Sequence, residues 1–282
     1  MIEPPFQFTQ SNLQDYLTCA QRFELRHLHH LNWPAVESAP IQEAERRMQL
    51  GSQFHRLIHQ HILGMPEENL TALVTETADL VESPELPQMW QHYLTARPEP
   101  LLNSDVQLYP EMVLSTMVGQ FRLLAKYDLL AFLSGSTPQV MIVDWKTTAR
   151  RTPSNRLRQQ AQSRVYPYVL VKAGQHLNDQ HPIDPNTVTM WYWFANDPQQ
   201  PEIITYSQAQ FDQDDHYLTN LISEIATAEI FPLTPDQKAC RYCVYRSYCD
   251  RGQAAGPLDE FEEDLEMAEL TLDWEQIAEI AY

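Results

Sequence analysis

The chain has 282 residues, of which 43% are hydrophobic and 10% aromatic, a composition that excludes an intrinsically disordered chain. No stretch is long and apolar enough for a membrane span, and the N-terminus lacks a basic and then apolar signal. We therefore expect a soluble, cytoplasmic protein with no membrane partner. The formal net charge of −19 argues at first against a nucleic-acid partner.

The charge is unevenly distributed along the chain. Residues 251–282 contain ten acids and one arginine, whereas no Asp or Glu occurs from residue 145 to residue 178. That acid-free stretch contains seven of the 19 basic residues. Basic runs often form only a solvated helix face, but a basic block inside an acidic protein indicates a site for a polyanion.

The N-terminal third of the chain is predicted to be helical. Residues 9–31 are typical of one capped helix, and residues 42–63 of a second, which the "GMP" at 64–66 ends. Residues 67–97 predict one or two short helices, broken around Pro84 and Pro87.

From residue 106 onward the pattern changes to strands. The runs 106–118, 120–133 and 139–147 are rich in β-prone residues, with the turn signals "VGQ" and "SGSTP" between them. Residues 154–174 predict one helix that contains a proline and ends at a glycine. Strands at 187–195 and 202–207 and a helix near 209–228 follow. This order predicts a mixed α/β domain with additional helices.

The third β-prone run ends on two opposite charges, in "QVMIVDWKTTARR". Because side chains alternate along a strand, Asp144 and Lys146 point to the same side of the sheet. Burying a carboxylate and an ammonium group is costly unless they pair with each other or hold a charged ligand. A surface ion pair at a strand end would also explain them, but the adjacent basic block favours a site for a metal ion and a phosphate.

Three of the four cysteines lie close together in "CRYCVYRSYC", at Cys240, Cys243 and Cys249, and the fourth is Cys19. In a reducing compartment cysteines are more typically metal ligands or free thiols than disulfides. A structural zinc usually uses two close pairs of ligands, whereas a set of three plus one suits an iron–sulfur cluster. If Cys19 joins the other three, the metal centre ties the first helix to the last segment.

Six motifs occur in an order that resembles the PD-(D/E)XK nuclease superfamily. Within it, the chain is similar to the RecB-like branch with an iron–sulfur cluster, which includes AddB nuclease domains and CRISPR-associated exonucleases. The motifs are S-x-L-x-x-Y-x-x-C-x-x-x-F (Ser11, Leu13, Tyr16, Cys19, Phe23), G-x-x-x-H (Gly51, His55), the second-motif acid (Asp128), D-x-K (Asp144, Lys146), Q-x-x-x-Y (Gln162, Tyr166) and the three closing cysteines.

The resemblance implies an α/β fold with an αβββαβ restriction-endonuclease-like core, a helical N-terminal part and a C-terminal iron–sulfur module. Residues 1–254 would form a single nuclease domain closed by a [4Fe-4S] cluster on Cys19 and the cysteines of 240–249, with Zn²⁺ as the less favoured occupant. Residues 255–282 would form an acidic amphipathic tail.

The implied activity is Mg²⁺- or Mn²⁺-dependent hydrolysis of DNA, as an exonuclease on single strands or ends, in repair, recombination or CRISPR adaptation. A helicase or a CRISPR-adaptation protein would be a partner. His55, Asp128, Asp144 and the backbone carbonyl of Trp145 would hold the metal, and Lys146 would position the attacking water. The residues implied in DNA binding are Gln162, Tyr166, Arg158, Arg150 and Arg151.

Alternatives remain at the level of function and of single residues. The chain could be a nuclease-like scaffold in which cleavage is dispensable, or a nuclease acting on RNA. Arg158, Gln162 and Tyr166 are spaced to share one face of the predicted helix, where Tyr166 could stack on a base or be a core aromatic. Glu111, in "YPEMVL", could be a strand acid of the kind that the superfamily sometimes carries near the site, but it is interpreted as a solvent-facing residue.

Overall fold

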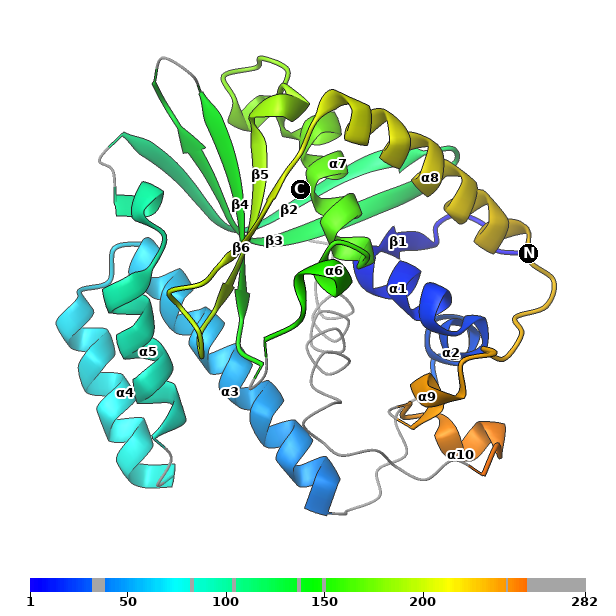
Figure 1. Cartoon of the computed structure of the whole chain (residues 1–282), viewed down its shortest axis with the longest axis horizontal. Coiled ribbons are helices and arrows are strands. Elements are labelled where there is room, and N and C mark those ends of the chain that lie inside the picture. Colours follow the sequence, from blue (N-terminus) through cyan, green and yellow to red (C-terminus); the bar gives the residue numbers. More distant parts are fainter. Residues whose placement is uncertain are drawn as a thin grey trace.

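The computed structural model describes residues 1–31, 39–81, 84–102, 105–135, 138–148, 151–241 and 243–252. A mixed six-stranded sheet is flanked by helices, which confirms the predicted mixed α/β fold (Figure 1). The strands are β1 Gln7–Thr9, β2 Val106–Val118, β3 Phe121–Leu133, β4 Gln139–Lys146, β5 Val188–Phe194 and β6 Glu202–Thr205.

The helices between β1 and β2 are α1 Gln10–Thr18, α2 Ala20–Phe23, the π-helix η1 Glu24–Leu28, α3 Ala39–Ile62, α4 Glu67–Val81, α5 Glu85–Ala96 and the 3₁₀ helix η2 Glu99–Leu102. Those after β4 are α6 Ser154–Leu157, α7 Ala161–Ala173, the 3₁₀ helices η3 Gly174–Leu177 and η4 Pro185–Thr187, α8 Gln208–Thr227, α9 Gln237–Cys240 and α10 Arg246–Cys249.

The sheet mixes antiparallel hairpins with two parallel pairs, β1 with β3 and β4 with β5. Strands β2, β3 and β4 pair antiparallel in succession, and Gly119, at φ 59°, allows the tight turn between the first two. β4 then pairs parallel with β5, and β5 antiparallel with the edge strand β6. A parallel pair requires a long connection, which α6 and α7 provide. They therefore cross over the sheet directly after Lys146.

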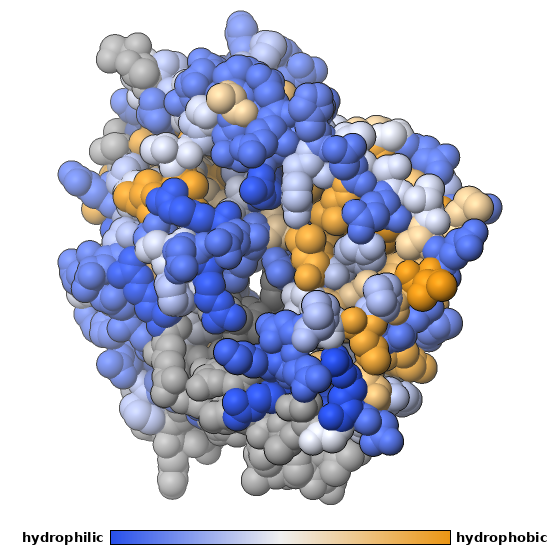
Figure 2. Space-filling view, turned by 45° about the vertical axis from the view of Figure 1, so that its right-hand side comes forward, coloured by the Kyte–Doolittle hydropathy of each residue, from blue (hydrophilic) through white to orange (hydrophobic). Residues whose placement is uncertain are grey.

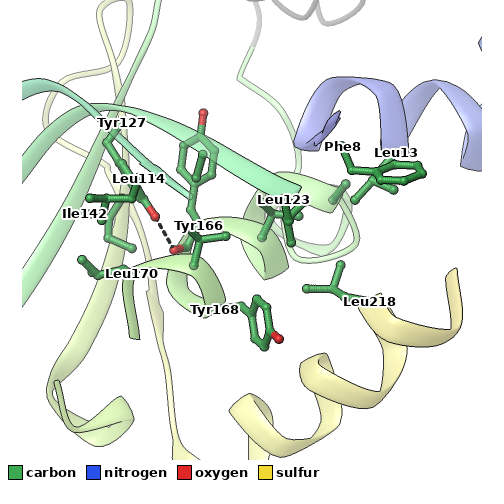
Figure 3. Close-up of a cluster of buried hydrophobic side chains, with 14 of the residues drawn as sticks. Phe8, Leu13, Leu114, Leu123, Tyr127, Ile142, Tyr166, Tyr168, Leu170 and Leu218 are labelled. Atoms are coloured by element: carbon green, nitrogen blue, oxygen red, sulfur yellow. Dashed lines mark hydrogen bonds between the residues drawn. The ribbon is translucent and has the colours of Figure 1, made fainter. Parts of the chain in front are cut away.

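Each face of the sheet is covered by its own hydrophobic cluster. On one face, residues of α1, α7 and α8 pack around Tyr127 and Tyr166 (Figure 3). On the other, residues of α3, α4 and α5 pack around Trp145 and Trp193. Along β4 the side chains alternate between the two clusters, as a strand buried on both faces requires.

The predicted helix 9–31 is wrong as a single element. Thr9 caps α1 with a capping box, but Cys19 takes an extended conformation at φ −163° and ψ 114°, and the helix stops there. A new helical segment then continues in a different direction to Leu28. Leu17, an apolar residue near the end of α1, is 42% exposed. Cys19 therefore ends α1 and begins α2, and it does not lie within a regular helix.

The predicted helix 154–174 is also two helices. α6 ends at Leu157, and α7 begins at Ala161 after Gln160 has returned to an extended conformation. β1 was not predicted, because a strand of three residues has too few alternating positions to show a pattern.

The surface is mixed in character. Hydrophilic residues cover most of the face seen in the space-filling view, and hydrophobic residues gather along its right-hand side (Figure 2). Among the described helices, none is long and apolar enough to cross a membrane.

Candidate active site

The end of β4 brings two opposite charges together under α7. The ammonium Nζ of Lys146 lies 3.0 Å from Oδ2 of Asp144, and the Asp144 residue is 5% exposed. Gln162, on α7, bridges the pair: its Nε2 donates to Oδ1 of Asp144, and its Oε1 accepts from Lys146 Nζ at 3.4 Å. Gln162 thus holds both charged groups in place.

Asp128 lies on β3, next to β4, and faces the helix α3. Its Oδ2 accepts from the backbone N–H of Trp145 at 2.8 Å, and its Oδ1 lies 3.4 Å from Nδ1 of His55. Burial raises the pKa of Asp128, but the imidazole of His55, the Trp145 N–H and the ammonium of Lys146 outweigh it and lower that pKa below the usual value. Asp128 is therefore a carboxylate, which is the form that binds a cation.

His55 joins the helical layer to the sheet. Its Nε2 lies 2.8 Å from the carbonyl oxygen of Trp145, which can only accept, so Nε2 donates. In a neutral imidazole Nδ1 is then an acceptor, and it faces the Asp128 carboxylate. Two facing acceptors are stabilised by a positive charge between them, either a second proton on His55 or a metal ion. Among the described residues, the ligand atoms that lie within 4.8 Å of one another come from His55, Asp128 and Glu111, and a histidine nitrogen with two carboxylates suits Mg²⁺ or Mn²⁺.

Glu111, interpreted from the sequence as a solvent-facing residue, lies beside His55 and Asp128. Its carboxylate, with His55 and Asp128, offers three ligand atoms within 4.8 Å of one another. It takes φ 52° in β2, and the pairing of β2 with β3 is interrupted between Pro110↔Leu129 and Met112↔Tyr127. Oε2 of Glu111 also lies 2.9 Å from Nζ of Lys126. The acid in "YPEMVL" was a visible signal, but only the strand pairing places it opposite Asp128.

Two predicted DNA-binding residues lie on α7, and both are buried. Gln162 is 3% exposed and contacts the charged pair. Tyr166 is 2% exposed and packs against Tyr127, and the Tyr127 hydroxyl donates to the backbone carbonyl of Tyr166 at 2.9 Å (Figure 3). Burial and the negative charges of Asp144 and Asp128 raise the pKa of Tyr166 well above its usual value. The ring of Tyr166 is therefore part of the hydrophobic core beside the site, and it is not available to stack on a base.

The predicted row of Arg158, Gln162 and Tyr166 on one helix does not exist. Arg158 follows α6 and precedes the break, so it does not share a helix face with Gln162. Arg158 and Arg151 instead both approach Glu202, on β6. Arg150, also predicted to bind DNA, lies outside the described residues.

The four cysteines come together at one pocket. Cys19, Cys240, Cys243 and Cys249 all line it, and none forms a disulfide. Burial and the neighbouring thiols of Cys19 and Cys240 raise the pKa of Cys249. The guanidinium Nη1 of Arg251 approaches Sγ of Cys240 at 3.5 Å. Four thiols with a cation beside them fit an anionic metal–thiolate centre.

Solved structures and a family model resemble this chain to different degrees. The solved structure of SSO0001 is 12% identical, with a TM-score of 0.40, over 89% of this chain and 88% of that one. A structure from Eubacterium rectale, whose assignment as an exonuclease is provisional, is 8% identical, with a TM-score of 0.47, over 89% and 90%. No curated protein matches. The model of the PD-(D/E)XK nuclease superfamily matches residues 7–250, and the chain therefore belongs to that superfamily.

Proposed function

We propose that the protein is a Mg²⁺- or Mn²⁺-dependent deoxyribonuclease that acts as an exonuclease on single strands or DNA ends. The observation that carries the proposal is the pair of charge clusters formed by His55 with Asp128 and by Asp144 with Lys146, in which the ammonium of Lys146 also lowers the pKa of Asp128. A purely structural ion pair would account for Asp144 and Lys146, but not for the imidazole and second carboxylate beside them.

The proposed roles follow from the chemistry of phosphodiester hydrolysis. A divalent ion held by His55, Asp128, Asp144 and the Trp145 carbonyl would neutralise phosphate charge and lower the pKa of a bound water. Lys146 would orient that water and offset charge in the transition state. Gln162 keeps the ammonium of Lys146 at a defined position. Glu111 adds a third carboxylate and strengthens the negative potential that attracts the cation.

We place the chain in the RecB-like branch with a [4Fe-4S] cluster held by Cys19, Cys240, Cys243 and Cys249. Their shared pocket supports this placement. The cluster would join α1 to the last described segment, so that residues 1–254 form one domain. Residues 255–282 would form an acidic tail outside the described residues, and DNA repair or CRISPR adaptation, with a helicase or adaptation protein, is the proposed context.

The test is a cleavage assay on end-labelled single-stranded and double-stranded DNA, with anaerobically purified protein. We expect cleavage with Mg²⁺ or Mn²⁺, none with EDTA, and a rate at least about 10²-fold lower in Lys146→Ala. Lys172→Ala, which removes a lysine that is 38% exposed on the far end of α7, is the matched control and should cleave normally. The position of the label reports the direction of digestion.

Two outcomes would replace the proposal. DNA binding without cleavage, unchanged by Lys146→Ala, would indicate the nuclease-like scaffold. Cleavage of a labelled RNA strand in preference to DNA of the same sequence would assign the activity to RNA.

A further inference from the structure

A row of paired residues leads from the active site to the edge of the sheet. Asp144 on β4 is paired with Tyr192 on β5, and Tyr192 is paired with Glu202 on β6. Paired residues of neighbouring strands point to the same face, and strands lie about 4.8 Å apart. Glu202 therefore lies on the same face as Asp144, roughly 10 Å away by this spacing.

Glu202 holds two arginines of the segment that follows Lys146. Its Oε1 accepts from Nη2 of Arg158 at 3.0 Å, and its Oε2 lies 3.6 Å from Nη2 of Arg151. Oε2 also accepts from Oγ of Ser154 at 2.5 Å. One carboxylate is thus enclosed by two guanidinium groups and a hydroxyl, while Nη1 of Arg151 also lies 3.5 Å from Oδ2 of the more exposed Asp197.

The arginines are open to solvent although the carboxylate is not. The side chain of Glu202 is 13% exposed, whereas those of Arg151 and Arg158 are 31% and 51% exposed. Between this cluster and Asp144 lies the ring of Tyr192, with the ammonium of Lys146 5.6 Å from its centre. Positive groups therefore extend from the active site to the sheet edge.

Guanidinium groups bind carboxylates and phosphates through the same forked geometry. The Glu202 carboxylate occupies the position that a phosphate would take between the two arginines. We propose that Arg151 and Arg158 form a subsite for a backbone phosphate next to the reacting one, and that Glu202 is a resident anion that competes with it. This inference rests on the proposed nuclease function and adds to it a residue that restrains substrate binding.

The alternative role for Glu202 is a structural link that fastens α6 to β6. The two roles predict opposite results for Glu202→Gln, which keeps an acceptor for Ser154 and removes the charge. If Glu202 is a competitor, neutralising it frees Arg158 and leaves Arg151 with Asp197 as its carboxylate partner, so affinity for nucleic acid rises. A structural link that is weakened leaves the arginines less ordered, so affinity stays the same or falls.

The experiment measures binding of a fluorescein-labelled oligothymidylate to the full chain in EDTA, by anisotropy at several salt concentrations. We expect Glu202→Gln to bind at least about threefold more tightly at low salt, since one exposed ion pair is worth up to about a fivefold change. The salt dependence should become steeper by about 0.7 for each arginine released. Glu229→Gln, at an exposed position after α8, changes the net charge equally and should leave binding unchanged.

Arginine variants separate the subsite from a general charge effect. Replacing Arg151 and Arg158 together by alanine should abolish the gain in the Glu202→Gln background and weaken binding when Glu202 is intact. The second measurement tests the subsite even if Glu202→Gln does not fold. Unchanged or weaker binding of a folded Glu202→Gln variant, or a gain that persists without the arginines, would overturn the inference. Metal-dependent cleavage by the wild type would in that case leave the proposed function standing.

Discussion

Replacing Asp15 by asparagine tests whether a buried charge cluster holds the N-terminal helices in place. Asp15 is 1% exposed, and its carboxylate lies 2.7 Å from Nε of Arg22, 2.9 Å from Nη1 of Arg26 and 2.8 Å from Nε2 of His27. Burial raises the pKa of Asp15, but these three partners outweigh it and hold that pKa well below the usual range. Asp15 is therefore charged in the folded protein.

The expected loss follows from what asparagine leaves behind. The Arg22 residue is 4% exposed, and without the carboxylate its guanidinium has lost the negative charge that compensates it. Removing one partner of a buried ion pair costs about 3–5 kcal/mol, and because the amide oxygen still accepts one hydrogen bond we expect about 3 kcal/mol. For a chain of this size each kcal/mol lowers the melting temperature by about 2–4 °C, so the expected decrease is about 6–12 °C.

The assay is thermal unfolding followed by circular dichroism, on samples with the same iron and zinc content per chain. Asp212→Asn is the matched control, because Asp212 is exposed on α8 and should change stability by less than about 0.5 kcal/mol. A decrease in melting temperature of less than 2 °C for Asp15→Asn, with the control unchanged, would refute the assigned role of the cluster.

Three further predictions concern packing, ionisation and the cysteines. Gly174→Ala should cost about 1–3 kcal/mol in a denaturant titration, because the new Cβ would lie 2.7 Å from Ile183 Cδ1, whereas Gly135→Ala, with no atom within 4 Å, should cost less than about 1 kcal/mol. Burial raises the pKa of both Tyr16 and Tyr93 to about 12, so stability should fall as pH rises from about 10 to 12, where only the unfolded chain loses these protons; a loss of tyrosinate absorbance near pH 10 from the folded protein on Tyr16→Phe or Tyr93→Phe would contradict this. Cys19→Ser should lower the iron content and visible absorbance of anaerobically purified protein, and zinc found in place of iron in the wild type would contradict the proposed cluster.

Much of the fold followed from local patterns. The β-prone runs, their turn signals and the order of helices and strands agree with the observed elements, because hydrophobic periodicity records which face of an element is buried. The alternation along "QVMIVDWK" also placed Asp144 and Lys146 on one face, where their charged atoms lie 3.0 Å apart. The motifs with His55 and Asp128 indicated the remaining groups of the site.

The tertiary structure alone decided which other residues reach the site. Glu111 faces Asp128 because of the pairing of β2 with β3, and Glu202 joins the row from Asp144 through two further strand pairings. The breaks at Cys19 and before Ala161, and the burial of Tyr166, likewise depend on how elements pack. Local sequence records the preference of a segment for helix or strand and for one buried face. The register between strands is set by contacts between residues far apart in the chain, and no single segment contains that information.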